Sequence, residues 1–360
     1  MSHLRTYLQD PFLANLYRQI RATGPIRSIS LDITHECNLR CTGCYYFEEG
    51  MDKIEVPEDE SAFDQFIEKE KQRGTNLITI VGGEPSLVLG RIKKLYDHFK
   101  VNVATNGLIK IPLEGFENLP IGVAIWGNRQ TDANLRSNGK RDLFKTALDN
   151  YRDDERAFWY YTVAPGHANE IESVVKTCIE NGNLVLFNYY SDISQRGGKL
   201  GHQDDFEKVR REIDRMIELF PGKILMTPYF NRLISTGLLF DEKWGYEVCT
   251  NLSTNFSPNA ERLKNGHAYN PHFRAYNADF NTTRRCCTGI NRSCDNCFDT
   301  WEHFSWAMIN LKKHLATKED FTNWLTTTYL FYFINRLVDY EKGKTLLPLF
   351  HDYIGVFSYA

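Results

Sequence analysis

Short apolar runs alternate with amphipathic stretches between residues 28 and 227. Six of the apolar runs have the length and the β-branched content of buried strands. They cover residues 28–33, 77–81, 101–105, 121–126, 158–163 and 184–188. The stretches between them carry apolar residues at helical spacing, as at Leu89, Ile92 and Leu95. This alternation predicts right-handed β–α–β units, and therefore an α/β fold with a parallel sheet.

The two flanks of this region differ from each other. Residues 4–22 have apolar positions near helical spacing, with a break or start at Asp10-Pro11, and predict a helical leader without chemistry of its own. At the other flank, a helix over 206–220 and an apolar run over 223–227 predict one further unit of the sheet.

The alternation stops after about residue 230. Residues 250–283 are rich in Asn, Thr, Ser and aromatic residues and predict an irregular segment, whereas 318–340 has the pattern of a helix with a large aromatic face. We therefore expect a leader over 1–25, an α/β domain over 26–230, and a mostly helical C-terminal region over 231–360 that covers its opening.

Composition and charge narrow the class of protein. Hydrophobic residues make up 42% and charged residues 25% of the chain, as in soluble globular proteins. The net charge of -3 and the pI near 6.4 give no electrostatic basis for binding nucleic acid or an anionic membrane surface. The first ten residues lack an apolar signal core, and no apolar run is long enough to span a membrane. We expect a cytoplasmic protein.

The chain has nine cysteines, which in a reducing compartment favours metal, redox or catalytic roles over disulfides. They are unevenly spread. Three lie at 37–44, Cys178 and Cys249 stand alone, and four lie between 286 and 297. Cys178 falls on the apolar face of a predicted helix and is interpreted as core.

Cys37, Cys41 and Cys44 directly follow the first predicted strand. Thiolates are soft ligands that suit iron–sulfur clusters and zinc. A cubane cluster usually takes four cysteines, so a cluster on these three would leave one coordination position to another ligand. The alternatives are three ligands of a zinc site, or buried cysteines at the start of a helix.

Together, these cysteines and the turn Gly82-Gly83-Glu84-Pro85, one β/α unit later, identify a family resemblance. The spacing resembles the C-x3-C-x2-C loop of the radical S-adenosylmethionine (radical SAM) enzymes, and the turn resembles their GGEP motif. The resemblance covers about residues 26–190. It implies a partial (β/α)6 barrel and a [4Fe–4S] cluster whose fourth iron is chelated by the amino and carboxylate groups of S-adenosylmethionine.

The resemblance also implies roles for individual residues. Gly82, Gly83 and Glu84 would contact the amino group of S-adenosylmethionine. Thr105-Asn106 would lie beside the site, as the family's TNG turn does. Arg136 would bind the carboxylate, a bidentate acceptor that a guanidinium matches; the alternative is a solvent-facing arginine.

Two positions depart from the family pattern. Trp126 stands where many members have an aspartate that contacts the ribose, so that contact is not carried over. Gly43 stands where many members have an aromatic residue near the adenine. Here the aromatic residues follow the third cysteine, as Tyr45 and Tyr46, and Tyr45 is the candidate cofactor contact.

The second cysteine group comprises Cys249, Cys286, Cys287, Cys294 and Cys297. It has three interpretations. Cys294 and Cys297, with two of the others, would hold an auxiliary iron–sulfur cluster or zinc. Alternatively, one or two of these thiols, with Cys286 and Cys287 as the candidates, would face the substrate as hydrogen donor or redox partner. The third interpretation is unligated, partly buried cysteines. The spacing does not fit the seven-cysteine SPASM pattern.

The segment Cys294–Cys297 followed by His303 resembles the C-x2-C-M-x-H tail of adenosylhopane synthase and the aminoglycoside 3′-deoxygenases. This short resemblance makes His303 a candidate at the substrate. The alternative is a histidine on a helix surface.

The function implied by the resemblance is family-level. An electron delivered to the cluster, from a reductant such as flavodoxin or ferredoxin, would cleave S-adenosylmethionine and give a 5′-deoxyadenosyl radical. We expect that radical to act on a small organic, sugar- or nucleoside-like biosynthetic substrate. The alternatives are radical modification of a peptide or protein side chain, and a non-catalytic iron–sulfur or zinc-binding redox or assembly protein.

Overall fold

A computed structural model describes residues 2–57, 59–192, 200, 203–236, 249–265, 270–289 and 297–354. Its sheet has eight strands in the order β6–β5–β4–β3–β2–β1–β7–β8. The strands are β1 Ser28–Asp32, β2 Leu77–Val81, β3 Lys100–Thr105, β4 Ile121–Ile125, β5 Ala157–Val163, β6 Leu184–Tyr189, β7 Ala275–Tyr276 and β8 Thr283–Arg284. All neighbours pair in parallel except β7 and β8. The predicted α/β fold with a parallel sheet is confirmed.

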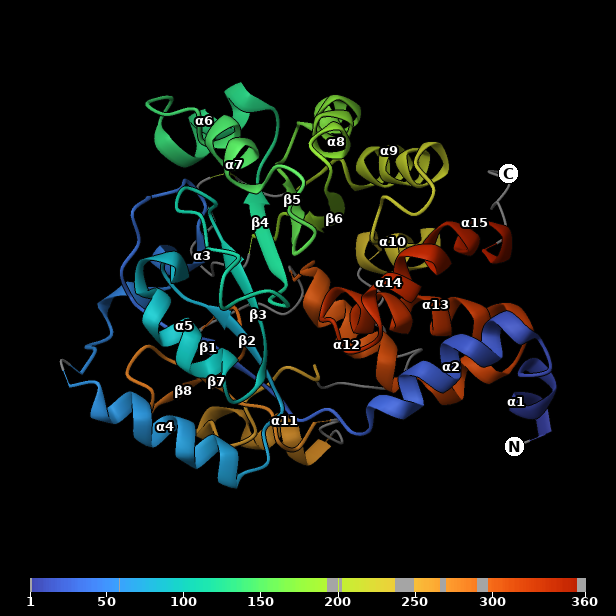
Figure 1. The fold of residues 1–360 in the computed structure, drawn as a ribbon, viewed down its shortest axis with the longest axis horizontal. Coiled ribbons are helices and arrows are strands. Elements are labelled where there is room, and N and C mark those ends of the chain that lie inside the picture. Colours follow the sequence, from blue (N-terminus) through green and yellow to red (C-terminus); the bar gives the residue numbers. More distant parts are fainter. Residues whose placement is uncertain are drawn as a thin grey trace.

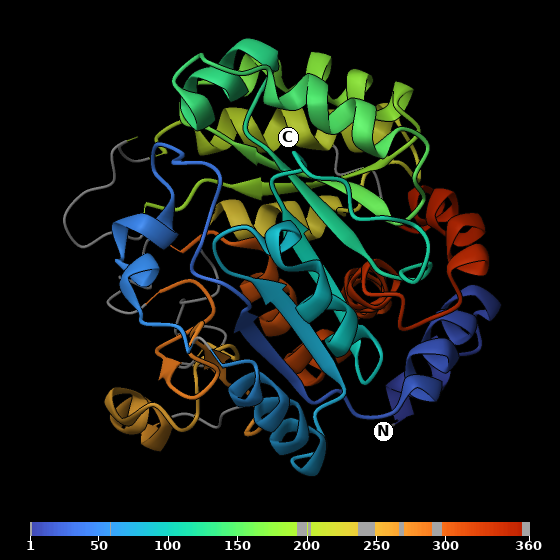
Figure 2. The same ribbon diagram turned by 60° about the vertical axis from the view of Figure 1, so that its left-hand side comes forward.

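Helices cover both sides of the sheet. They are α1 Ser2–Tyr7, α2 Pro11–Thr23, α3 Tyr45–Glu48, α4 Ser61–Gln72, α5 Leu89–Tyr96, α6 Arg129–Ser137, α7 Leu143–Tyr151, α8 Ile171–Glu180, α9 Phe206–Leu219, α10 Pro228–Ser235, α11 Ala260–Asn265, α12 Thr300–Ile309, α13 Lys318–Ile334, α14 Tyr340–Leu346 and α15 Phe350–Tyr353. Figures 1 and 2 show α7 and α8 along one side of the strands and α12 and α13 along the other.

Side chains alternate between the two faces of the sheet, so that one face packs in the core and the other lines a cavity. In β2, Ile78 and Ile80 are fully buried in the hydrophobic core, whereas Thr79 and Val81 line a cavity on the opposite face. On β3 and β4 the cavity face carries small or polar residues, including Ala104. The inner face is therefore not filled by the strands' own side chains, which leaves room for a ligand between the sheet and the C-terminal helices.

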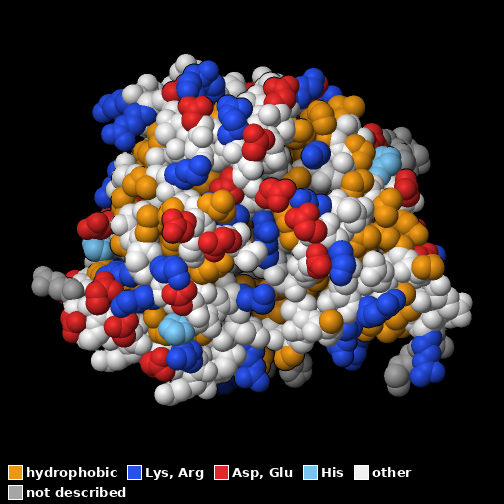
Figure 3. Space-filling view, viewed as in Figure 1, with side chains coloured by type: hydrophobic (Ala, Val, Ile, Leu, Met, Phe, Trp, Pro, Cys, Tyr) orange, Lys and Arg blue, Asp and Glu red, His pale blue; other side chains and the backbone are white. Residues whose placement is uncertain are grey.

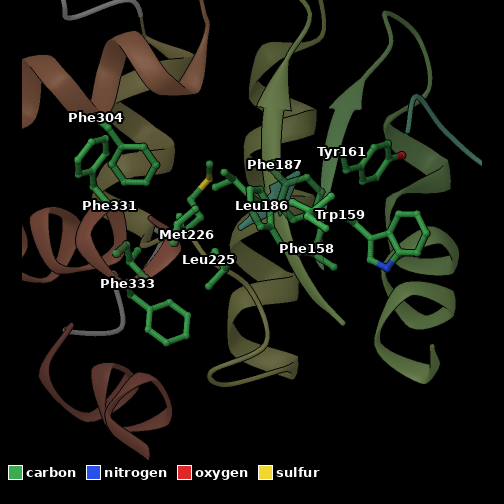
Figure 4. Close-up of a cluster of buried hydrophobic side chains, with 14 of the residues drawn as sticks. Phe158, Trp159, Tyr161, Leu186, Phe187, Leu225, Met226, Phe304, Phe331 and Phe333 are labelled. Atoms are coloured by element: carbon green, nitrogen blue, oxygen red, sulfur yellow. The ribbon is translucent and has the colours of Figure 1, made fainter. Parts of the chain in front are cut away.

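Helix α13 is buried over its whole surface from Phe321 to Ile334. Its buried surface includes threonines and an asparagine as well as apolar residues, and α13 packs against α2 and α12. Figure 4 shows Phe304 and Phe331 of these helices facing Leu225 and Met226, with Phe187 of β6 beyond them. The predicted helix over 318–340 ends earlier, because Arg336 takes a left-handed conformation with φ of 50°.

The leader is confirmed as helical, in two pieces. The carboxylate of Asp10 accepts hydrogen bonds from the backbone N–H groups of Phe12 and Leu13, and so caps α2. Phe12 stacks on Tyr353 of α15 with 4.2 Å between ring centroids. The N-terminal leader is thus joined to the C-terminal helices.

Two expectations beyond residue 220 need correction. Residues 250–283 are not irregular throughout, because β7 pairs in parallel with β1 and continues into the antiparallel strand β8. Strands of two residues are too short to show a period of two in the sequence. The apolar run over 223–227 contributes a single parallel bridge, between Val185 and Ile224, instead of a full strand.

On the face shown in Figure 3, basic and acidic side chains of the described residues are interspersed and form no continuous patch of one sign. None of the described helices has the length and apolar character that crossing a bilayer requires.

Candidate functional site

The turn over 82–84 packs directly on the start of the cysteine loop. The Gly83 N–H donates to the Thr34 carbonyl at 2.9 Å, and the Glu84 N–H donates to the Glu36 carbonyl at 2.7 Å. A Cβ atom on Gly83 would lie 1.9 Å from the Glu36 carbonyl oxygen. The close approach that these glycines permit is therefore, in the first place, to the chain's own backbone.

Replacing Gly83 by Ala is expected to destabilise the fold by roughly 2–3 kcal/mol, because the new Cβ can be accommodated only if the cysteine loop moves. The matched control is Gly90→Ala in α5. Nothing lies within 4 Å of a Cβ at Gly90, so alanine there should stabilise the helix by about 0.5–1 kcal/mol. Denaturant unfolding of both variants gives the comparison. Equal stability of the two would contradict this packing.

Glu84 joins the same turn to the end of β3. Its carboxylate accepts hydrogen bonds from the Thr105 hydroxyl at 2.6 Å, the Asn106 N–H at 2.7 Å and the Ser86 N–H at 2.9 Å. The Asn106 amide in turn donates to the Asn38 side chain at 2.6 Å. A carboxylate has about four acceptor positions, so Glu84 retains capacity for one more donor, such as an ammonium group. The three motif segments form one hydrogen-bonded unit.

Cys37, Cys41 and Cys44 are all at least partly buried. The pKa of Cys37 is raised to about 11 and that of Cys44 to about 12, mainly by burial and to a smaller extent by the neighbouring thiols. Within the described part of the chain, no three His, Cys, Asp or Glu side chains are placed to hold a single metal ion. Ligands of a cubane cluster bind different iron atoms and do not meet at one point. The assignment of these three thiols to a cluster, and the zinc alternative, stay predictions.

Arg136 is not the solvent-facing arginine of the alternative prediction, because its side chain is only 2% exposed. Its guanidinium pairs with Asp132, with 3.0 Å between Nη1 and Oδ1, and donates to the Ala124 carbonyl at 2.6 Å. Burial raises the pKa of the Cys41 thiol, and the charge of Arg136 opposes that shift. Arg136 therefore lies beside the cysteine loop. Its contact with a cosubstrate carboxylate stays a prediction.

The aromatic residue Tyr190 lies against Gly43. A Cβ atom there would come within 2.8 Å of the Tyr190 hydroxyl. The Tyr190 ring makes an edge contact with Trp126, with 6.1 Å between centroids. Tyr190, just after β6, thus places an aromatic group beside Gly43, the position at which many family members have an aromatic residue of their own. The sequence analysis did not single it out, although Tyr189-Tyr190 directly follows a predicted strand.

The cavity on the inner face of the sheet has a volume of about 270 Å³. Its lining includes Gly43 and Tyr45 of the cysteine loop together with residues of the C-terminal region, such as Cys287. Its described lining includes the carboxylates of Asp299 and Glu302 and contains no Lys, Arg or His. Burial and the charge of Asp32 raise the pKa of Tyr45 well above its usual range. The cavity therefore connects the cysteine loop to the second cysteine group.

The members of the second cysteine group lie in different surroundings. Cys249 and Cys286 pack with Leu252 in a small apolar cluster. Cys287 instead faces the cavity, and Cys297 is buried. Cys294 lies outside the described residues. Since no group of three ligands for a metal ion occurs in the described ranges, an auxiliary metal site stays a prediction.

His303 is fully buried in α12, so the alternative of a surface histidine is wrong. Its Nδ1 bonds the Asp299 carbonyl at 2.7 Å, and burial lowers its pKa to about 4. It does not line the cavity. A role at the substrate therefore has no support from its position.

The sequence analysis also missed a buried ion pair behind the cavity. Arg284 at the end of β8 donates to Asp32 at the end of β1, with 2.8 Å between Nη2 and Oδ1, and each side chain is 1% exposed. Burial raises the pKa of Asp32 to about 6, although the guanidinium opposes the shift. The pair joins residues 252 positions apart in the chain, at the base of the cysteine loop.

The fold and the site together define an α/β protein with a thiol-rich loop at the carboxyl end of the first strand. A family model described as a 4Fe-4S single cluster domain matches residues 24–116. The GTP 3′,8-cyclase of Staphylococcus saprophyticus is 23% identical over 269 residues, which are 67% of this chain and 76% of that protein. The sporulation killing factor maturation protein SkfB of Bacillus subtilis is 28% identical over 177 residues, which are 44% of this chain and 41% of that protein.

Solved structures that this chain matches include anSMEcpe with bound AdoMet and a peptide. The match has a TM-score of 0.49 and 18% identity, and covers 78% of this chain and 80% of that one. Streptococcus suis SuiB bound to the precursor peptide SuiA matches with a TM-score of 0.44 and 15% identity over 57% of this chain, which spans only 49% of SuiB.

These comparisons support the resemblance of the cysteine loop and the Gly82–Glu84 turn to those of the radical SAM enzymes. A [4Fe–4S] cluster and S-adenosylmethionine are the cofactors of that family.

Proposed function

We propose that Cys37, Cys41 and Cys44 hold a [4Fe–4S] cluster that cleaves S-adenosylmethionine reductively. When bound, this pair of cofactors supplies a 5′-deoxyadenosyl radical able to take a hydrogen atom from an unactivated C–H bond. The observation that carries the proposal is the single unit formed by the cysteine loop, the Gly82–Glu84 turn and the turn after β3. A protein that only binds metal has no need for the remaining acceptor position on Glu84, which suits the amino group of S-adenosylmethionine.

The chain's own residues would bind and orient the cosubstrate. The remaining acceptor position on Glu84 suits its ammonium group, and Arg136 is the candidate for its carboxylate. Tyr45, Trp126 and Tyr190 present aromatic surface at the end of the cavity nearest the cysteine loop. The buried walls would exclude water, which protects reactive intermediates.

The cavity lining supports a substrate class. A volume of about 270 Å³ suits a small organic molecule or a single side chain. Asp299 and Glu302 are the charged groups of the described lining, which includes no cationic residue. Such a lining suits a neutral or cationic substrate with hydrogen-bond donors and disfavours a nucleotide polyphosphate. We infer that the substrate is a small, unphosphorylated organic molecule, such as a sugar- or nucleoside-like one.

A second candidate is radical modification of a peptide side chain. The similarity to SkfB, which is a maturation protein, favours it. The same cavity would then receive one side chain of a longer substrate. A one-electron reductant such as flavodoxin or ferredoxin is part of both proposals.

Anaerobically reconstituted protein given dithionite and S-adenosylmethionine is expected to release 5′-deoxyadenosine and methionine in equal amounts, measured by liquid chromatography and mass spectrometry. Omitting the reductant is the control and should give neither product. If reconstituted protein with a full cluster binds no cosubstrate and forms no 5′-deoxyadenosine, the proposed function is wrong.

A further inference from the structure

Cys287 is held in the wall of the cavity by a carboxylate. Its thiol donates a hydrogen bond to Oε1 of Glu302 on α12, and the Thr288 hydroxyl donates to the same oxygen at 3.3 Å. Both Cys287 and Glu302 line the cavity. The nearby Cys286 differs, because it packs in the small apolar cluster with Cys249 and does not line the cavity. Two adjacent cysteines thus have different surroundings.

The backbone at Cys287 is fixed relative to the cysteine loop. Arg284 uses Nη2 twice, donating to Oδ1 of Asp32 at 2.8 Å and to the Cys287 carbonyl at 2.9 Å. Asp32 ends β1, the strand that leads into Cys37, Cys41 and Cys44. A buried ion pair is costly to form and is a poor source of stability. Its effect here is to connect the position of Cys287 to the base of that loop.

The same cavity contains a polar group that points to a ligand. The Ser30 hydroxyl lines the cavity, is 2% exposed, and has no hydrogen-bond partner within the described structure. Buried hydroxyls are nearly always hydrogen-bonded to protein, water or ligand. A bound molecule in this cavity would satisfy Ser30 and would lie beside Cys287.

A thiol in such a place has a specific chemical use. An S–H bond is weaker than an aliphatic C–H bond, so a thiol gives its hydrogen atom readily to a carbon radical. Resting on the proposed function, we propose that Cys287 is the hydrogen-atom donor to carbon radicals formed in the cavity, with Glu302 as the proton group that restores it.

The proposed step balances as follows. The S–H bond of Cys287 breaks and a C–H bond forms on the radical carbon, which leaves a sulfur radical on Cys287. The one-electron reductant that serves the cluster supplies one electron and converts this radical to a thiolate. The thiolate then takes a proton from solvent by way of Glu302, and the thiol is regenerated. The substrate radical is thereby quenched without a further partner in the cavity.

The first test needs no knowledge of the substrate. Protein reconstituted in D₂O carries S–D groups, and dithionite with S-adenosylmethionine then produces 5′-deoxyadenosine without substrate. The wild type is expected to give mostly singly deuterated 5′-deoxyadenosine. In Cys287→Ala the deuterated fraction should fall about tenfold, whereas the matched control Cys286→Ala should behave as the wild type.

The second test measures the reactivity of the Cys287 thiol directly and needs no turnover. In unreduced protein, iodoacetamide alkylation of Cys287 is followed by peptide mass spectrometry. Burial and the Glu302 carboxylate hold the pKa of Cys287 well above its usual range. Glu302→Gln should therefore increase the alkylation rate of Cys287 several-fold at a fixed pH, because the thiolate fraction rises. An unchanged rate would contradict the pairing.

The remaining outcomes also decide the proposal. Equal deuterium in the wild type and Cys287→Ala overturns it. Loss of iron from Cys287→Ala, with Cys286→Ala unaffected, also overturns it and makes Cys287 a cluster ligand. If the wild type forms 5′-deoxyadenosine in either case, the proposed function survives while this inference fails. If the wild type forms none, both fail.

Discussion

Replacing Cys37, Cys41 and Cys44 together by Ala is expected to remove about four iron atoms per chain and to abolish 5′-deoxyadenosine formation. The three thiols are the proposed ligands of the cluster, and no other described cysteine lies in their loop. Iron analysis and the product assay on anaerobically reconstituted protein measure both effects. Iron that persists in this variant would identify an auxiliary cluster on the second cysteine group.

The matched control is Cys178→Ala. Cys178 is fully buried in α8 as part of the hydrophobic core, so its loss should leave the iron content unchanged. Far-ultraviolet circular dichroism of all variants separates loss of the cluster from loss of the fold. A triple variant that keeps four iron atoms and forms the product would contradict the assignment.

Replacing Arg284 by Met is expected to lower the free energy of unfolding by about 3–5 kcal/mol. The substitution leaves Asp32 buried without its cation, and the carbonyl groups of Tyr276 and Cys287 lose a donor. Denaturant unfolding of the cluster-free protein gives the measurement. The matched control is Arg129→Met, whose ion pair with Asp142 is exposed and should contribute at most about 1 kcal/mol.

Two further variants test the origin of this effect. Asp32→Asn combined with Arg284→Met removes both buried charges, and should be more stable than Arg284→Met alone.

The pKa of Asp32 is raised from 3.8 to about 6 on folding, so the folded state binds more protons in that range. The stability of the wild type relative to Asp32→Asn should therefore fall as the pH rises through 6. A difference that rises with pH would contradict the shifted pKa.

The regular part of the fold was predictable from the sequence because it repeats. All six strands from β1 to β6 lie within about two residues of the apolar runs that predicted them. The hairpin β7–β8 was not predictable, because each strand has two residues and its partner β1 lies about 250 positions earlier. The division of the chain at residues 25 and 230 stays a prediction, although Phe12 and Tyr353 show that the two flanks pack together.

The candidate site also has a part that the sequence predicted and a part that it did not. The cysteine loop and the turn at Gly82–Glu84 are contiguous motifs, and the structure joins them through short backbone hydrogen bonds. Residues that reach the site from distant elements form no recognisable pattern in the local sequence. Arg284 is a single arginine in an irregular segment, and only the folding of β8 beside β1 brings it to Asp32. Glu302 and Cys287 likewise come together only in the tertiary structure.

The central claim is that S-adenosylmethionine binds an open iron of a cluster held by Cys37, Cys41 and Cys44. Pulsed electron paramagnetic resonance of the reduced cluster, with cosubstrate labelled by ¹⁵N in its amino group or ¹⁷O in its carboxylate, tests it most directly. We predict hyperfine coupling between the cluster and both labels, and its loss in Cys41→Ala. A reduced cluster that couples to neither label, in protein shown to bind the cosubstrate, would contradict the account.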